Sequence, residues 1–457
     1  MRSCICLSPS NGFQVFVILV MMIHRKKYDI VIFGGTGLTG RAVVEDLALS
    51  VSSGKTSGIS WAVSSRNCEK MVKILHEIQD SNETGDLSNI TVIEADVKDE
   101  TSLRRMTQQT RVLINCVGPF KSTGEAVILS CLSTHTHYLD MSTESVFLER
   151  MQVKYCLSAE EAGVLVVGSC GSKSLVCELG LQFLQKNFPG ELVWTESFGS
   201  DSGHSGHSDS MSCMTWDTLL GVMASSRELR RIRKTLFESV FEKKTPKYRH
   251  KLKSHSFRSH PLNGWLVCVP PSYDIDSDVV RRTQTQSYID NNSRPVQLVS
   301  YVTLGSWFRL IPLSLHTLLF GPLIFLLSSF SSGRSILSCF PRFFSWGSFS
   351  RTGPSITASN FEVVLVGKGY LTELNTPEEE PVPPPGEVTM SLRIKGPEYA
   401  HRTASSCINQ AAVTLLKERD KIRFRGGILT PGLVFRETSL RQRIQKHGIS
   451  FDILNSI

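Results

Sequence analysis

A strand of apolar residues that ends in a glycine-rich turn constrains this chain more than any other feature. Residues 30–33 read Ile-Val-Ile-Phe, a continuous run that is typical of a strand buried on both faces of a parallel sheet. The next residues follow the spacing Gly-x-Gly-x-x-Gly, which permits a tight turn, close approach of the backbone to a pyrophosphate and close helix packing. We therefore expect a dinucleotide site formed by Gly34, Gly35, Thr36, Gly37, Leu38, Thr39 and Gly40.

The segments that follow the turn support this interpretation. A helix is predicted over 38–49, and its unpaired N–H groups would face a phosphate without any charged side chain. An ordinary strand-to-helix turn is the alternative, because a lone glycine motif occurs in many folds. Apolar runs at 59–63, 90–93 and 112–117 continue a βαβ pattern, however, and predict an α/β fold with a Rossmann-type, doubly wound parallel sheet.

The end of the second strand indicates which nicotinamide cofactor fits. A carboxylate there would bind the 2′-hydroxyl of NAD, but the chain has Ser64, Ser65 and Arg66, which suit the 2′-phosphate of NADP. We therefore expect NADP, with NAD less well suited. Asp96, after the third strand, is expected near the adenine. The residues expected near the nicotinamide ribose follow the fourth strand and are Cys116, Val117, Gly118 and Pro119.

The sequence assigns no catalytic residue. His137, Tyr138 and Lys173 could each donate a proton, but each is equally explained by a structural role. The Tyr-x-x-x-Lys pair of short-chain dehydrogenases is absent. The histidines of the polar loop at 200–210 could be drawn as metal ligands, yet such Ser/Gly-rich loops usually contact only solvent, and we expect no metal site.

Positive charge is concentrated in one stretch of the chain. The net charge is +8, and 227–258 contains twelve Lys or Arg residues against three Glu. A solvated surface segment explains this, as does a surface held against anionic lipid. Nucleic acid is not expected as a partner, because no known binding motif accompanies the charge.

A second informative stretch lies at 311–330, where twelve of twenty residues are strongly apolar and none is charged. The aromatic residues around it, within 310–347, suit a lipid interface. Pro312 and Pro322 oppose a straight membrane-spanning helix. We expect a hairpin or shallow insertion into one leaflet, and the alternatives are a spanning segment and a buried helical pair or oligomer contact.

Several separate motifs together resemble those of the saccharopine dehydrogenase-like oxidoreductases. They are Gly34 to Gly40, Asn115 to Phe120, His137 to Asp140, Asp278 to Thr283, Gly367 to Tyr370, Lys395 to Glu398 and Gly426 to Gly432. The animal lipid-droplet-associated members also carry an apolar insertion where 311–330 stands. The resemblance implies an NAD(P)-dependent oxidoreductase that acts on a lipid-like substrate, at the cytosolic face of a lipid droplet or membrane.

The resemblance also implies how the chain is divided. Residues 1–26 are expected to be an N-terminal extension, and 27–180 a dinucleotide-binding Rossmann domain. Residues 181–425 would form a mixed α/β domain for substrate and dimer contacts, which carries the apolar insertion at 310–347 as a membrane-associating element. Residues 426–457 would be a C-terminal return segment. A homodimer is therefore an expected partner beside the lipid surface.

Two departures from the family pattern bear on activity. Thr143 stands where members have glycine in the motif that begins at Asp140. The motif at 171–180 lacks the usual Phe, Asp and Pro, and Lys173 replaces a carboxylate. The alternative to an enzyme is therefore a non-catalytic lipid-surface scaffold or cofactor sensor that retains the dinucleotide fold.

Overall fold

The computed structural model leaves several stretches of the chain undescribed. Nearly all of the N-terminal extension and most of the polar loop at 200–210 lie outside the described residues. The residues described are 26–81, 84–171, 173–201, 211–241, 243–260, 264–269, 274–303, 310–345, 349–350, 360–374 and 385–456.

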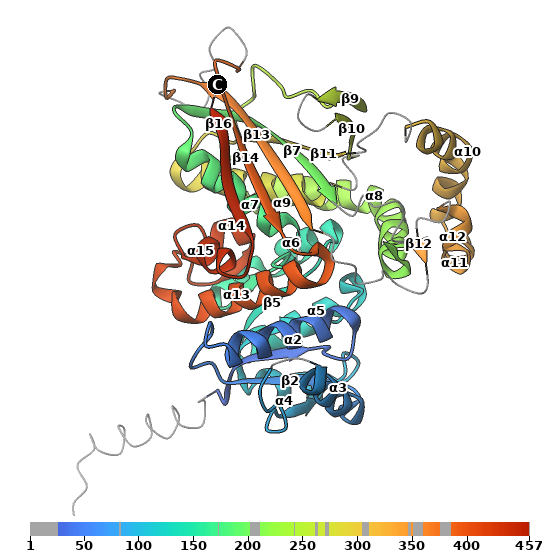
Figure 1. Cartoon of the computed structure of the whole chain (residues 1–457), viewed down its shortest axis with the longest axis vertical. Helices are drawn as coiled ribbons and strands as arrows, with labels where there is room; N and C mark the ends of the chain where they lie inside the picture. The colour runs from blue at the N-terminus through green and yellow to red at the C-terminus, as the bar shows by residue number, and fades with distance from the viewer. Residues whose placement is uncertain are drawn as a thin grey trace, which may run out of the picture.

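Seven parallel strands form the first sheet, in the lower half of Figure 1. Their order, β3-β2-β1-β4-β5-β6 followed by β15, is that of a doubly wound dinucleotide fold with one added strand, and it confirms the predicted Rossmann-type sheet. The strands are β1 (Tyr28–Phe33), β2 (Trp61–Ser65), β3 (Val92–Glu94), β4 (Thr110–Asn115), β5 (His137–Asp140), β6 (Leu165–Val167) and β15 (Gly427–Leu429).

Helices cover both faces of this sheet, as the apolar run of β1 requires. Ile30 and Ile32 belong to a core cluster with residues of α2 and α3, whereas Val31 and Phe33 pack with residues of α4, α5 and α6 on the other face. Alternate side chains of a strand point to opposite faces, so a strand buried on both sides must be apolar throughout. The helices are α2 (Leu38–Ser52), α3 (Cys68–Ser81), α4 (Glu100–Thr107), α5 (Phe120–Ser133) and α6 (Ser145–Glu161).

The second sheet also has seven strands, in the order β16-β14-β13-β7-β11-β10-β9. Only β7 and β11 pair in parallel, so this sheet is mixed, as expected. Helices α7 (Lys173–Asn187) and α9 (Ile275–Asn291) pack against it. The strands are β7 (Glu191–Asp201), β9 (Phe257–His260), β10 (Gly264–Cys268), β11 (Gln297–Thr303), β13 (Phe361–Tyr370), β14 (Val388–Gly396) and β16 (Ser450–Ser456).

The C-terminal part of the chain contributes to both sheets. Helix α13 (Ala404–Lys417) packs on α2, where the amide of Asn409 donates to the carbonyl of Val43 (3.0 Å) and to the carboxylate of Asp46 (2.8 Å). Strand β15 then joins the first sheet and β16 the second. Two short helices, α14 (Pro431–Val434) and α15 (Leu440–Gln445), lie between these strands in sequence.

The apolar stretch at 311–330 lies in a helical lobe at the right of Figure 1. The lobe consists of α10 (Leu310–Ser328), α11 (Ser331–Cys339) and α12 (Pro341–Phe344). One side packs on α8 (Cys213–Ser239) through a cluster that includes Trp216 and Leu337. Pro322 lies inside α10. Among the described residues, no helix is both long enough and apolar enough to cross a membrane.

Helix α8 also carries much of the basic stretch at 227–258, and not all of that charge faces solvent. The guanidinium of Arg233 is largely buried, where it forms an ion pair with Glu149 at 3.1 Å and a second one with Asp278. This residue therefore helps to hold α8 on α6 and α9, in contrast to the expectation of a wholly solvated segment.

Candidate functional site

Glycine occupies the positions of the turn after β1 for different structural reasons. Gly34 has a φ of +93°, which disfavours any side chain. A Cβ at Gly40 would overlap the carbonyl oxygen of Gly34, and one at Gly35 would lie 2.8 Å from the Met71 sulfur. A Cβ at Gly37, by contrast, would meet nothing closer than 3.5 Å. Internal packing therefore explains Gly35 and Gly40, whereas Gly37 opens onto free space that a ligand can approach.

Two helices begin at the point where the strand order reverses, and only one has a side-chain cap. The carboxylate of Glu144 accepts hydrogen bonds from the backbone N–H groups of Phe120 (2.8 Å) and Lys121 (2.9 Å), and so occupies the start of α5. Helix α2 begins after Gly37, which has no side chain to cap it, and within the described part of the chain no side chain takes the place that Glu144 has at α5. Its first N–H groups and the positive end of its dipole are thus available to an anion. This arrangement fits the pyrophosphate of a dinucleotide.

The structure brings the predicted selectivity residues to the same edge of the sheet. Ser65 ends β2, and its hydroxyl lies 3.5 Å from the hydroxyl of Thr36 in the glycine-rich turn. Arg66 follows and is exposed. Asp96 lies beyond β3, where its carboxylate accepts a hydrogen bond from the N–H of Lys98 (2.9 Å). These residues fit a phosphate-bearing ribose, because an exposed guanidinium and hydroxyls lie beside the turn.

The segment after β4 contacts the glycine-rich turn directly. A Cβ at Gly34 would lie 2.7 Å from the Val117 side chain, so these two positions adjoin. Gly118 is exposed, and a Cβ there would meet nothing closer than 3.9 Å. Burial, with a contribution from Asp140, raises the pKa of the Cys116 thiol to about 12, so this thiol stays protonated and is a poor nucleophile. The segment therefore provides a backbone wall to the site.

The three candidate proton donors all have structural partners. The N–H of Leu165 donates to Nδ1 of His137 at 3.0 Å. Tyr138 is fully buried, which raises its pKa well above its usual value. The ammonium of Lys173 lies 3.9 Å from the buried carboxylate of Asp276. Lys173 therefore compensates a buried negative charge, which gives the unusual lysine a structural role.

His137 should make the fold sensitive to acid. Burial, followed by the charges of Arg419, Arg111 and Lys26, lowers its pKa from 6.5 to about 4. The unfolded chain binds the proton first in this window, so stability falls as the pH falls through it. We expect the wild type to lose about 2 kcal/mol more stability than His137→Asn between about pH 7 and about pH 5, because the variant has no imidazole to titrate. The amide oxygen of the asparagine can still accept the hydrogen bond from Leu165. Urea unfolding at both pH values measures this, and parallel losses in the two proteins would contradict it.

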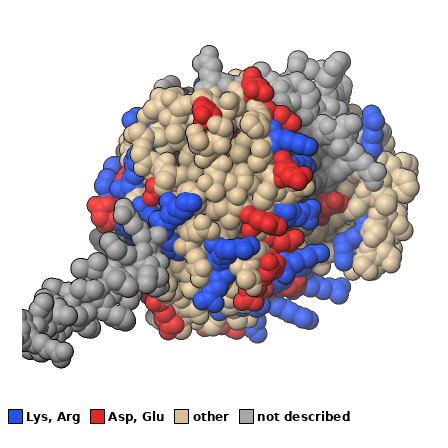
Figure 2. Space-filling view, turned by 90° about the horizontal axis from the view of Figure 1, so that it is seen from below, with Lys and Arg blue, Asp and Glu red and all other residues tan. Residues whose placement is uncertain are grey.

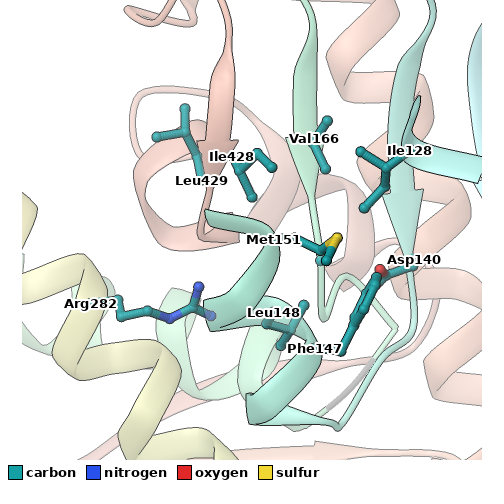
Figure 3. A pocket seen from close by; sticks show the side chains of 10 residues that line it. Ile128, Asp140, Phe147, Leu148, Met151, Val166, Arg282, Ile428 and Leu429 are labelled. Atoms are coloured by element: carbon teal, nitrogen blue, oxygen red, sulfur yellow. The ribbon is translucent and has the colours of Figure 1, made fainter. Parts of the chain in front are cut away.

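A small cavity lies behind the end of β5 (Figure 3). Its walls are mostly apolar, but the Asp140 carboxyl and the Arg282 guanidinium also reach it. Burial raises the pKa of Asp140 to about 6 despite several hydrogen bonds to the carboxylate. The space is about 10 Å³, close to the least that one water needs. It can hold a bridging water but no substrate.

Sequence reasoning gave no role to three side chains at this edge, namely Asn115, Asp140 and Glu144. Asn115 and Asp140 are fully buried at the ends of neighbouring strands, and Glu144 caps α5. The available signal was their position, since Asn115 and Asp140 lie in the motifs from Asn115 to Phe120 and from His137 to Asp140, and Glu144 lies in the motif that begins at Asp140. Their hydrogen-bond partners could not be read from the sequence, because these depend on strand register.

Comparisons with known proteins find relatives over nearly the whole chain. Residues 30–167 match the family described as Saccharopine dehydrogenase NADP binding domain. The human protein named Saccharopine dehydrogenase-like oxidoreductase is 33% identical over 443 residues, covering 95% of this chain and 99% of the relative. A Caenorhabditis elegans protein named Lipid droplet localized protein is 32% identical, with coverages of 93% and 98%. An Arabidopsis thaliana relative, named as a probable mitochondrial saccharopine dehydrogenase-like oxidoreductase, is 30% identical, with coverages of 94% and 97%.

Proposed function

The chain belongs to the saccharopine dehydrogenase-like oxidoreductases and has their NADP binding domain at residues 30–167, and on this premise we propose that it is an NADP-dependent oxidoreductase. The first turn of α2 holds the pyrophosphate, and Ser65 and Arg66 hold the 2′-phosphate. Residues 116–119 lie along the nicotinamide ribose, and Asp96 lies near the adenine. When bound, the cofactor supplies a hydride, and the protein orients the substrate and excludes water.

The open position at Gly37 is the observation that carries this proposal. The fold itself does not require glycine there, since a Cβ would meet only the Gly34 carbonyl at 3.5 Å. The adjoining helix start has no side-chain cap, whereas the neighbouring start of α5 is occupied by Glu144. A helix start without a side-chain cap beside Ser65 and Arg66 is the arrangement that a 2′-phosphorylated dinucleotide needs.

We further propose that the protein acts at a lipid surface on a lipid-like substrate. The outer side of α10 to α12 exposes many large apolar side chains, and the lobe at the right of Figure 2 is largely uncharged. A contiguous apolar face of this kind marks an interaction site on a protein surface. The name of the Caenorhabditis elegans relative supports a lipid droplet as that surface.

A cofactor sensor or scaffold is the second candidate function, and one observation favours it. His137, Tyr138 and Lys173, the proton donors suggested by the sequence, are all held by partners inside the protein. A dinucleotide fold in which these groups serve structure can bind NADPH without reducing a substrate. The two candidates therefore share the cofactor site and differ only in turnover.

Replacing Arg66 tests the cofactor site and its selectivity. We expect Arg66→Ala to weaken NADPH binding about tenfold or more and to leave NADH binding unchanged, because only NADPH carries the 2′-phosphate that a guanidinium binds. Titration followed by the fluorescence of bound NADPH measures both affinities. If the wild type binds neither cofactor, the proposal is wrong. If it binds NADPH, consumption of the bound cofactor with membrane-lipid extracts distinguishes an enzyme from a sensor.

A further inference from the structure

A continuous chain of hydrogen bonds connects the buried end of β5 to the segment after β4. The hydroxyl of Tyr138 donates to Oδ2 of Asp140 (2.9 Å), and the amide nitrogen of Asn115 donates to the Tyr138 oxygen (3.1 Å). The amide oxygen of Asn115 in turn accepts from the N–H of Val117 (3.0 Å). Asn115, Tyr138 and Asp140 are fully buried, so water cannot replace these bonds at low cost.

The strand pairing places these groups within reach of one another. Asn115 and Asp140 are direct partners in the β4–β5 register, and both occupy the last position of their strands. Oδ1 of Asp140 is fixed separately, because it accepts from the N–H groups of Ser142 (2.9 Å) and Ser169 (3.0 Å). The carboxylate is therefore a rigid starting point for this series of hydrogen bonds.

The direction of each donated proton follows from the ionised carboxylate. A carboxylate only accepts, so the Tyr138 hydroxyl must donate to Asp140 and its oxygen is left to accept. The NH₂ group of Asn115 must then face Tyr138, which turns the amide oxygen toward Val117. The N–H of Val117 can only donate and requires the same orientation, so the carboxylate and this N–H fix the Asn115 amide from both ends.

The other end of this series of hydrogen bonds, at Val117, lies at the proposed cofactor site. The Val117 side chain adjoins Gly34, which starts the glycine-rich turn, and the carbonyl of Val117 accepts from the hydroxyl of Thr123 (2.9 Å). Val117 is thus held at both its N–H and its carbonyl. The two residues after it, Gly118 and Pro119, are exposed.

We propose that Asn115, Tyr138 and Asp140 are positioning residues, which together hold the 116–119 segment in the place that receives the nicotinamide half of the cofactor. This inference rests on the proposed NADP site and adds to it the buried side chains that set its geometry. Asp140 acts through Tyr138 and Asn115, and none of the three contacts the cofactor. The adenine half is bound by other strand ends and should be unaffected.

Reversing the donor–acceptor direction of these hydrogen bonds tests the inference. In Asp140→Asn, the new NH₂ group donates to Tyr138, whose proton then requires an acceptor at Asn115. The Asn115 amide must turn over and place its NH₂ group against the N–H of Val117. We expect about tenfold weaker binding of NADPH and unchanged binding of adenosine 2′,5′-bisphosphate, which lacks the nicotinamide. Calorimetric titration with each ligand gives the two affinities.

A second substitution should restore the site. In Asp140→Asn with Asn115→Asp, the carboxylate at 115 accepts from both Val117 and Tyr138, and every group is paired again with the opposite proton direction. We expect NADPH affinity to return to within about twofold of the wild type. Should Asp140→Asn not fold, Tyr138→Phe carries the test with about fivefold weaker NADPH binding. Tyr155→Phe, which removes a hydroxyl bonded to Glu125 (2.6 Å), is the matched control.

The outcomes separate the two proposals. If the wild type binds NADPH but Asp140→Asn binds both ligands equally more weakly, the positioning role is wrong. It is also wrong if the double variant does not recover NADPH affinity. Failure of the wild type to bind NADPH would overturn the proposed function, and this inference with it. A selective loss for NADPH that the double variant reverses would establish the role, since a merely structural network would affect both ligands.

Discussion

Gly37→Asp is expected to weaken NADPH binding more than about a hundredfold. The variant should nevertheless be at least as stable as the wild type. Gly37 has φ −79° and ψ 162°, which any residue can adopt, and a Cβ there makes only an ordinary contact with the Gly34 carbonyl at 3.5 Å. Aspartate is a favoured helix cap and would accept hydrogen bonds from the first turn of α2. Its carboxylate would then occupy the N–H groups that we assign to the pyrophosphate and would repel the phosphates.

Thermal unfolding and NADPH titration of the same samples measure the two effects. Gly221→Asp is the control, because a Cβ at Gly221 in α8 meets nothing within 4 Å and the substitution lies outside the cofactor site. Gly40→Ala provides the contrast, since its Cβ would overlap the Gly34 carbonyl, and it should reduce stability by about 3 kcal/mol. NADPH binding that survives Gly37→Asp would show that the cofactor does not use this turn.

The periodicity of the chain was sufficient to predict a parallel, Rossmann-type first sheet, but not the added strand β15. Each strand was an apolar run followed by a turn signal, and the order of βαβ units then fixes the sheet because crossovers are right-handed. The ends were less well determined, since the predicted strands at 59–63 and 90–93 begin two residues later, at Trp61 and Val92. Apolar flanking residues do not reveal where the hydrogen-bonded ladder starts.

The resemblance implied a C-terminal return segment at 426–457, but which strand it would pair with could not be predicted from the sequence. Strand β15 pairs with β6 from 262 residues farther along the chain, with Gly427 opposite Leu165. No local pattern in three residues specifies such a partner. The same holds for Lys173, whose unusual charge in the motif is explained only by Asp276 in α9. The glycine-rich turn was predictable because its chemistry is local, whereas the hydrogen bonds behind it depend on register between strands.

The second large effect concerns the exposed side of α10. Leu318, Leu319, Phe325 and Leu326 are 74%, 60%, 61% and 62% exposed, and their spacing places them on one side of the helix. Ile324, on the opposite side, is buried against α8. The fold therefore does not need the four apolar side chains. Transfer of each into hydrocarbon would stabilise attachment by about 1.5–3 kcal/mol, so together they can anchor the protein to a lipid surface.

Replacing all four residues with aspartate should release the protein from lipid droplets and liposomes, with at least about a hundredfold loss of partitioning. Flotation of the purified protein with each kind of particle measures this. Stability should change by less than about 0.5 kcal/mol per site, because the residues are exposed. Leu157→Asp with Leu371→Asp is the matched control, since these side chains are 68% and 63% exposed outside the lobe. Attachment that persists in the fourfold variant would show that α10 is not the anchor. The basic surface of α8, where Arg230 and Arg231 are exposed, would then be the alternative contact with the lipid.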